Sequence, residues 1–287
     1  MIPIIKSLAA ATRFFKQRFF TLFLILYVGS LLQQILRFIF LTELNISRYT
    51  NLPSIVTGMA ILEKISSEKY LLLLPLAWIL IGIWMYGVLY VSLGGSPLGM
   101  AIAAGLKNMH RYFGFVIAAT VLSLILLFIL TVPGLILMGR ISPHAFFDKT
   151  SSIFLVPIAL ILMLPGIATV ISLSNGPFIL LLENKGILES MRESFRRVYP
   201  VLVPAGALLG IGVLAGAAAY YLMLWIVFRI EVLLVPADQI TVQRLVALIV
   251  NGVPWVIAAG WFDALVYQMY TRLKLNLVAP PDQHVAS

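Results

Sequence analysis

Hydrophobic positions in this chain form long unbroken runs, and polar positions gather in short stretches between them. A transmembrane helix needs roughly 20 apolar residues to cross about 30 Å of hydrocarbon. Strands of a membrane barrel alternate apolar and polar positions instead. The pattern therefore predicts an all-α polytopic bundle of about six transmembrane helices, over residues 19–41, 70–93, 113–138, 151–182, 201–228 and 245–270.

Amphipathic segments lie beside these spans. Residues 3–18 place apolar side chains on one helical face and lysine and arginine on the other, and residues 94–112 form a second segment of mixed character. Helices of this kind lie in the headgroup region with their apolar face toward the acyl chains. We expect interfacial helices at both places.

The stretch LENKGILESMRESFRRVYP, residues 182–200, carries four basic and three acidic side chains. Its spacing predicts an amphipathic helix with Asn184 as N-cap and Pro200 as stop. Acidic and basic residues three or four apart are expected to pair along its solvent side. We interpret it as a connector helix on the inner leaflet; a headgroup-binding or gating element and a catalytic segment are the alternatives. The expected apolar face is Ile187, Leu188, Met191, Phe195 and Val198.

The fourth run, residues 151–182, is too long for one simple crossing, since a straight helix of this length would measure roughly 48 Å. Pro157, Pro165 and Pro177 lie within it. Each proline removes a backbone donor, so bends or breaks are expected. One tilted, kinked span and a span with a re-entrant piece both remain open.

The segments after the second and fourth spans are similar at an offset of 89 residues, PLGMAIAAGLKNMHRYF aligning with GILESMRESFRRVYPVL. This indicates an internal repeat of three-helix units, each with a surface helix between its second and third spans. Such duplication is common in transporters, whose sites lie between the repeats. Membrane proteins that transport nothing have it as well.

Composition excludes a soluble protein, because the mean hydropathy is +1.04 and only 11% of residues are charged. The net charge of +9 comes from basic residues beside the spans. The positive-inside rule and anionic lipid explain that placement better than nucleic acid does. Of the 20 lysines and arginines, twelve fall on the side of the two termini and eight on the other, which favours cytoplasmic termini.

Residues for catalysis are scarce. The chain has no cysteine, which excludes disulfides, thiolate catalysis and cysteine-ligated zinc. His110, His144 and His284 are far apart, and none has a second ligand four residues on. We therefore expect a protein that is not an enzyme and that holds no metal and no cofactor.

Polar residues inside spans are costly to bury and are often functional. Asp263 is the only acidic residue within a predicted span. Either it pairs with a cation such as Arg18, Lys107 or an arginine of residues 187–198, or it binds a proton or a headgroup.

The other intramembrane polar residues have structural interpretations. Gln33 and Gln34 are expected to form interhelical hydrogen bonds, and Arg37 is expected to extend to the membrane surface. Asn175 and Asn251 are expected to make helix-packing contacts.

The segment LMLPGIATVISLSNGPFILLLENKGILESMRESFRRVYPVLVPAG resembles the signature of the YciC-like family of uncharacterised Gram-negative inner-membrane proteins. The similarity lies in Pro165-Gly166-Ile167, in the turn from Glu183 to Gly186, and in Ser190-Met191-Arg192 with Ser194. More distantly, the chain resembles the membrane domain of some glycerophosphodiester phosphodiesterases. The resemblance implies an inner-membrane protein of about six helices and brings no catalytic residues. The chain departs from the family pattern in residues 42–69 and 139–150.

These observations favour a lipid-associated or envelope-related membrane protein that is not an enzyme, with anionic phospholipids as partners. The alternative is a small secondary transporter that uses Asp263 and the kinked fourth span. We expect one integral membrane domain over residues 1–275 and a disordered tail over 276–287, in a monomer or a homodimer. No partner protein is predicted. The candidate headgroup-binding residues are Lys107, Arg111, Arg192, Arg196 and Arg197.

Overall fold

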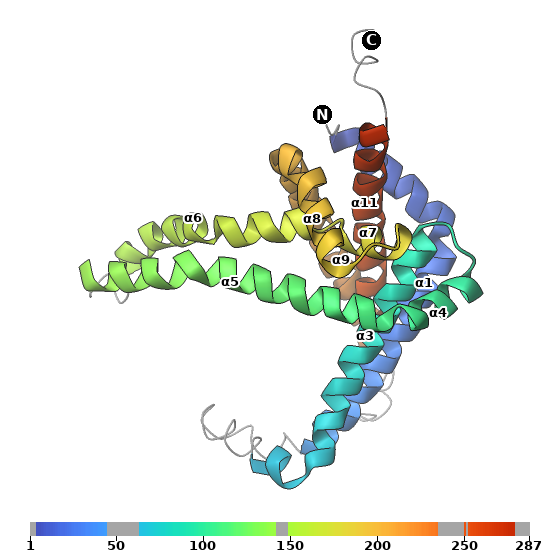
Figure 1. Cartoon of the computed structure of the whole chain (residues 1–287). Coiled ribbons are helices and arrows are strands. Elements are labelled where there is room, and N and C mark those ends of the chain that lie inside the picture. Colours follow the sequence, from blue (N-terminus) through green and yellow to red (C-terminus); the bar gives the residue numbers. More distant parts are fainter. Residues whose placement is uncertain (1–3, 45–62, 142–148, 235–249, 251, 279–287) are drawn as a thin grey trace. The chain divides into compact units, whose positions relative to one another are not determined.

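The computed structural model describes residues 4–44, 63–141, 149–234, 250 and 252–278, and all its regular elements there are helices (Figure 1). The predicted all-α bundle is confirmed. Asn251, most of residues 42–69 and 139–150, and residues 279–287 of the predicted tail lie outside these ranges. The elements are α1 (Ile4–Leu44), η2 (Lys69–Leu72), α3 (Leu73–Leu93), α4 (Leu98–Lys107), α5 (Met109–Ile141), α6 (Lys149–Leu173), α7 (Gly176–Leu182), α8 (Ile187–Val198), η4 (Tyr199–Val201), α9 (Leu202–Leu234) and α11 (Gly252–Val278).

Within the described ranges, five helical stretches are long and apolar enough to cross a membrane, so the protein is a multi-pass membrane protein. The sixth predicted span corresponds to α11, which is a helix of 27 residues but is not among those five. The five stretches are Ile4–Leu44, Lys69–Leu93, Met109–Ile129, Ile161–Leu182 and Ile187–Val227.

Helix α1 runs without interruption for 41 residues, so the predicted surface helix 3–18 and the first span are one helix. Residues 4–28 contain neither glycine nor proline that would break it. Four aromatic side chains at intervals of four residues also bridge the expected boundary, with ring centroids 5.3–5.5 Å apart. They are Phe15, Phe19, Phe23 and Tyr27.

The long fourth run breaks at Ser174 and Asn175, between α6 and α7, and Pro177 is the second residue of α7. Proline fits the first turn of a helix, because the donor that it lacks has no partner there. A Cβ on Gly176 would lie 2.1 Å from the Phe115 ring of α5, so only glycine permits α7 to begin this close to α5. Of the three prolines expected to bend the run, this one coincides with the break, while Pro157 and Pro165 lie inside α6.

Helix α4 packs closely on the end of α3. A Cβ on Gly105 would lie 2.5 Å from a methyl group of Val88 and 3.0 Å from its backbone nitrogen. Ala101, one turn earlier, is also fully buried. Met100 and Leu106 point outward instead, as in a helix lying along a membrane surface.

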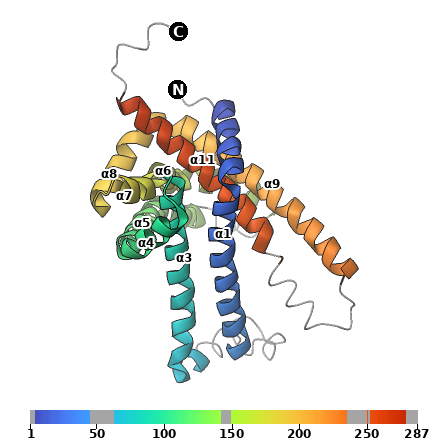
Figure 2. The same cartoon turned by 90° about the vertical axis from the view of Figure 1, so that its right-hand side faces the viewer.

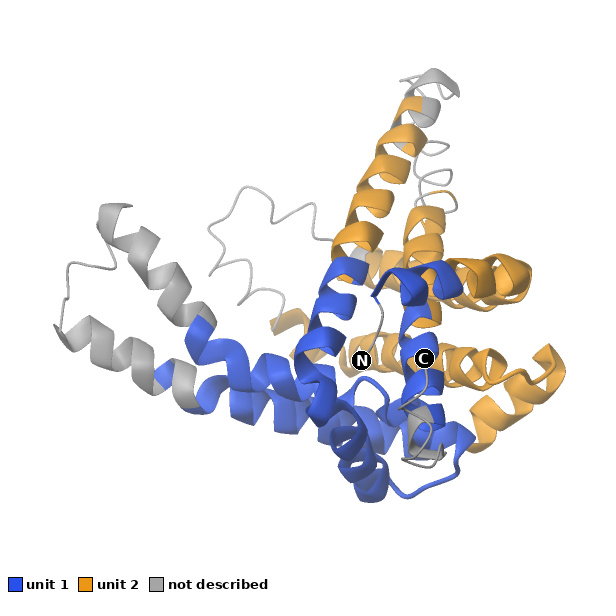
Figure 3. Ribbon diagram, turned by 90° about the horizontal axis from the view of Figure 1, so that it is seen from above, with its two compact units in different colours: residues 1–11, 110–212, 265–287 blue, residues 12–109, 213–264 orange. Residues whose placement is uncertain are grey.

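The chain divides into two compact units, each assembled from separate stretches of sequence (Figure 3). Unit 1 comprises Met1–Ala11, His110–Gly212 and Leu265–Ser287. Unit 2 comprises Thr12–Met109 and Val213–Ala264. Within unit 2, α1 and α3 run side by side (Figure 2), and the Gln33 amide of α1 donates to the Trp78 carbonyl at 3.0 Å. Neither unit coincides with one of the three-helix repeats suggested by the sequence.

The 89-residue offset nevertheless aligns residues with the same packing. Ala101 and Gly105 of α4 align with Ser190 and Ser194 of α8, and all four are buried. Gly105 contacts the preceding span α3, and Ser194 donates to the Ser172 carbonyl of α6 at 2.6 Å. In both surface helices, small residues permit close approach to the span that precedes them.

We predict that Gly105→Ala lowers stability while Gly99→Ala does not. The new methyl at position 105 meets the backbone of Val88, and such overpacking costs about 1–3 kcal/mol. At position 99 no atom lies within 4 Å, so alanine should give only its better helix propensity, up to about 1 kcal/mol. Thermal unfolding of both purified variants in detergent measures the difference. Equal melting temperatures would contradict the close α3–α4 contact.

Candidate functional site

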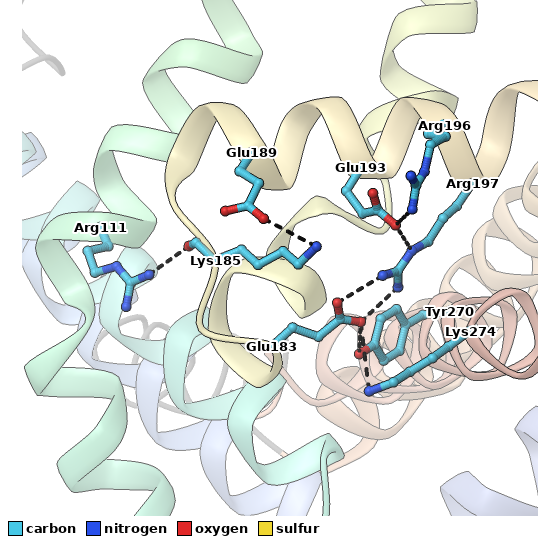
Figure 4. Close-up of polar contacts among 9 residues, drawn as sticks. All are labelled: Arg111, Glu183, Lys185, Glu189, Glu193, Arg196, Arg197, Tyr270 and Lys274. Carbon is cyan, nitrogen blue, oxygen red and sulfur yellow. Dashed lines mark hydrogen bonds and ion pairs between the residues drawn. The ribbon is translucent and has the colours of Figure 1, made fainter. Parts of the chain in front are cut away.

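The candidate site is built around Glu183, the first residue after α7 (Figure 4). The guanidinium of Arg197, from α8, donates to both carboxylate oxygens of Glu183, at 2.7 and 2.8 Å. The Arg197 side chain is 6% exposed. This bidentate geometry is the strongest form of arginine–carboxylate pairing. It joins residues fourteen positions apart and fixes α8 to the end of the preceding span.

Further hydrogen bonds complete the charge balance around this pair. The Nε of Arg197 donates to Glu193 at 2.9 Å, and Arg196 donates to the same oxygen at 2.7 Å. The Tyr270 hydroxyl of α11 donates to Glu183 at 2.9 Å, and the Lys274 ammonium lies 3.8 Å from it. A buried ion pair is tolerated when such bonds satisfy its remaining polar atoms, as they do here.

Electrostatics keep Glu183 ionised. Burial by itself raises the pKa of the Glu183 carboxyl, but hydrogen bonds from Arg197 and Tyr270 outweigh the burial and hold the pKa below its ordinary value. The carboxyl is therefore a charged acceptor at neutral pH. A general acid or base needs a pKa near the working pH, so this arrangement suits structural fixation rather than proton transfer.

Aromatic packing supports the same junction of α7, α8 and α11. Phe178 of α7 is fully buried, and its ring stacks on Tyr270 with centroids 5.3 Å apart. A second ring, that of Tyr267, lies 5.5 Å away. Since Tyr270 both stacks on α7 and bonds Glu183, helix α11 contacts the apolar and the charged side of the junction.

The turn between α7 and α8 is held from α5. Arg111 donates to the Asn184 side-chain oxygen at 2.5 Å and to the Lys185 carbonyl at 2.6 Å. Asn184 has a left-handed backbone with φ of 54°, a conformation that asparagine tolerates better than most residues. The prediction of Asn184 as N-cap was wrong: Gly186 occupies that position, and Asn184 is needed for the turn itself.

The outward side of α8 differs in part from the predicted one. Leu188, expected on the buried apolar face, is 78% exposed. Glu193 and Arg197, expected to pair along the solvent side, are buried. Glu189 pairs with Lys185 at 3.3 Å rather than with an arginine of α8. Met191 and Val198 of the predicted apolar face are buried as expected. Helical spacing misplaced the charged pair because Glu183, outside the helix, attracts Arg197 inward.

The candidate headgroup residues therefore separate into two groups. Arg192 and Arg196 are exposed on α8, and Lys107 is exposed in the last turn of α4. Arg111 contacts the α7–α8 turn, and Arg197 is enclosed between two carboxylates. We therefore withdraw Arg197 as a headgroup ligand, since its guanidinium donors point to Glu183 and Glu193.

Two members of this network were not singled out from the sequence, namely Glu183 and Tyr270, the tyrosine that donates to it. The available signal was the position of Glu183 directly after an apolar run, where an acid needs a partner. Tyr270 had no comparable signal, because tyrosine is common at the ends of membrane spans.

The intramembrane polar residues lie apart from this junction in sequence. Gln33 makes the interhelical bond to Trp78 described above, whereas Gln34 contacts Ser30 within its own helix at 3.4 Å. Arg37 lines a small cavity of about 150 Å³ that also includes Trp78. Asn175, at the α6–α7 break, is fully buried, and its amide has no hydrogen-bond partner within the described part of the chain.

Asp263 of α11 is 6% exposed and has no hydrogen bond or ion pair to any residue that the structure describes. The expected cation partners are therefore not found at this carboxyl. In the same described ranges, no three residues among histidine, aspartate and glutamate gather as metal ligands would.

Comparisons of the chain with protein-family models, with curated proteins and with solved structures give no match.

We predict that Arg197→Met destabilises the protein by about 3 kcal/mol, the lower end of the range for breaking a buried pair. The substitution roughly keeps the length of the side chain and leaves the largely buried Glu183 charge with Tyr270 and Lys274 as its partners among the described residues. Arg196→Met is the matched control, because its exposed pair with Glu193 is worth about 0–1 kcal/mol. Thermal unfolding in detergent compares the two. A loss no greater for Arg197→Met than for the control would refute the role assigned to the buried pair.

Proposed function

We propose that this protein is a lipid-associated protein of the bacterial inner membrane, without enzymatic activity, in which the outward face of α8 binds anionic phospholipid headgroups. The observation that carries the proposal is a mixed stripe on that face. Leu188 and Tyr199 are 78% and 70% exposed, and the exposed Arg192 lies between them. Apolar and cationic side chains on one exposed face suit the boundary between acyl chains and phosphates.

The spacing places these residues together. Positions 188, 192, 195 and 199 follow at intervals of four, three and four and so share one side of a helix. Arg192 and Arg197 are five residues apart and point about 140° away from each other. When Arg197 is fixed inward to Glu183, Arg192 must point outward.

The charges on this face are available to a ligand. Arg192 has no acidic partner within the described part of the chain, and Arg196 is 68% exposed despite its contact with Glu193. Each basic residue near an anionic membrane surface contributes about 1 kcal/mol of attraction. Two such residues next to apolar anchors favour anionic lipid over zwitterionic lipid.

The orientation belongs to the same proposal. We place α8 and both termini on the cytoplasmic side, supported by the excess of basic residues there and by the resemblance of residues 163–206 to the YciC-like family.

The proposal predicts that the double variant Arg192→Gln, Arg196→Gln loses phosphatidylglycerol binding. Removing two charges should lower affinity by about 2 kcal/mol, or roughly 30-fold, and leave phosphatidylethanolamine binding unchanged. Native mass spectrometry of the protein released from detergent measures both lipids. Lys69→Gln, at an exposed lysine of η2, is the control for loss of charge. If the double variant retains phosphatidylglycerol as the wild type does, headgroup binding by α8 is excluded.

A second candidate function, proton-coupled transport, is favoured by one observation. Asp263 is buried in α11 without a partner among the residues that the structure describes. Buried acids within spans mark ion and proton pathways in many transporters. Asp263 belongs to unit 2, whereas α8 belongs to unit 1, so separate variants test the two functions.

For this second function, Asp263→Asn should abolish proton movement that is driven by a solute gradient in reconstituted vesicles. The amide has the same shape but binds no exchangeable proton at this position. An internal pH-sensitive dye reports proton entry when amino acids or sugars are added outside. Gln34→Ala is the control, because it removes a polar group whose hydrogen bond among the described residues stays within its own helix. Proton movement that persists in Asp263→Asn, or that never occurs in the wild type, would eliminate this candidate.

A further inference from the structure

Helix α5 closely approaches α6 at Gly166 and the start of α7 at Gly176. A Cβ on Gly166 would lie 2.8 Å from the Leu127 backbone, and a Cβ on Gly176 would lie 2.1 Å from the Phe115 ring. Between these two contacts lies a groove of about 580 Å³. The close glycine contacts define its two ends.

The groove is apolar and open at the protein surface. Leu124, Ile167 and Val170 line it and are also exposed at the protein surface, which in a membrane-spanning segment is the surface that meets lipid. Its polar contributors are hydroxyls, and the Ser174 hydroxyl already donates to the Ile171 carbonyl at 2.7 Å. The walls therefore suit a hydrocarbon ligand.

The dimensions match one leaflet. Phe115 and Leu127 line the two ends of the groove and are twelve residues apart on the uninterrupted α5, which corresponds to about 18 Å of helix. This is slightly more than half of the roughly 30 Å hydrocarbon thickness. The volume lies within the roughly 300–1,000 Å³ typical of small-molecule sites. A single acyl chain fits this length and shape.

One end of the groove adjoins the charged surface. Gly114, next to Phe115, packs against Ile187 at the start of α8, where a Cβ would lie 2.8 Å from the isoleucine methyl. Arg111 is one turn away on α5 and contacts the α7–α8 turn. The positive charge of Arg111 thus lies at this end of the groove. There it would meet the phosphate of a lipid whose acyl chain enters the groove.

We propose that the α5–α6 groove binds one acyl chain of an anionic phospholipid whose headgroup lies at the N-terminal end of α8. This inference rests on the proposed lipid association and specifies its ligand as a diacyl phospholipid in the leaflet of α8. Charge complementarity at the Phe115 end selects this occupant over an uncharged hydrocarbon.

The test uses the full chain in vesicles that contain phosphatidylglycerol with a photoreactive diazirine in one acyl chain. Crosslinked peptides are then mapped by mass spectrometry. Crosslinks should concentrate on groove residues. They should be lost in Ala119→Phe and in Ser123→Phe, since each adds a ring inside the groove. Ile125→Phe is the control, because Ile125 is exposed on α5 and does not line the groove.

Three outcomes overturn the inference. Crosslinks spread evenly over the exposed faces of the spans indicate ordinary surrounding lipid. Crosslinks unchanged in both filled variants show that the groove holds no chain. Absence of lipid crosslinks in the wild type, together with dimers that a protein crosslinker traps through the groove, assigns the groove to a homodimer interface. Two variants are used so that failure of one to fold leaves the other informative.

The same assay with photoreactive phosphatidylcholine of identical chains separates this inference from the proposed function. Equal groove labelling by both lipids keeps the acyl-chain site but overturns the anionic headgroup assigned to it, together with the charge-selective binding of the proposed function. Labelling that is selective for phosphatidylglycerol but lies on α8 alone overturns the groove site and leaves the proposed function standing.

Discussion

The paired hydrogen bonds between Arg197 and Glu183 are the constraint on which the organisation of unit 1 depends. An enclosed guanidinium is stable only beside a carboxylate, and Glu183 lies at the end of the preceding span. The pair therefore fixes both the position and the rotation of α8. Arg192 and Leu188 point outward as a consequence, and the proposed lipid-binding face exists because one arginine of the helix is held inside.

Close contact of helix backbones is the second organising feature. Helices in a membrane gain little from burying apolar side chains, since lipid is equally apolar, and they associate through small residues that permit close packing. Gly105, Gly166 and Gly176 each lie where any side chain would collide with a neighbouring element. The contacts at Gly166 and Gly176 also leave a groove between them. Close packing at glycine therefore accounts both for the contact of α6 and α7 with α5 and for the groove.

The candidate functions use different parts of the molecule. The charged stripe of α8 and the α5–α6 groove belong to unit 1, whereas Asp263 belongs to unit 2. The unit 1 features share one chemistry, because cations and an apolar groove of leaflet depth together match a phospholipid. Asp263 is an isolated carboxyl among described residues, and its chemistry is that of a proton or a cation.

The sequence by itself determined the secondary structure and most of the spans, because the length and continuity of apolar runs decide whether a helix can cross a membrane. It also predicted the amphipathic character of α8 and three prolines as candidate break points, of which Pro177 coincides with the break. Only the tertiary structure decided that Glu193 and Arg197 of α8 point inward and Leu188 outward, since that depends on Glu183 and on Tyr270, residues outside the helix. The same holds for the groove, because its walls come from two helices whose close contacts at glycine no local periodicity records.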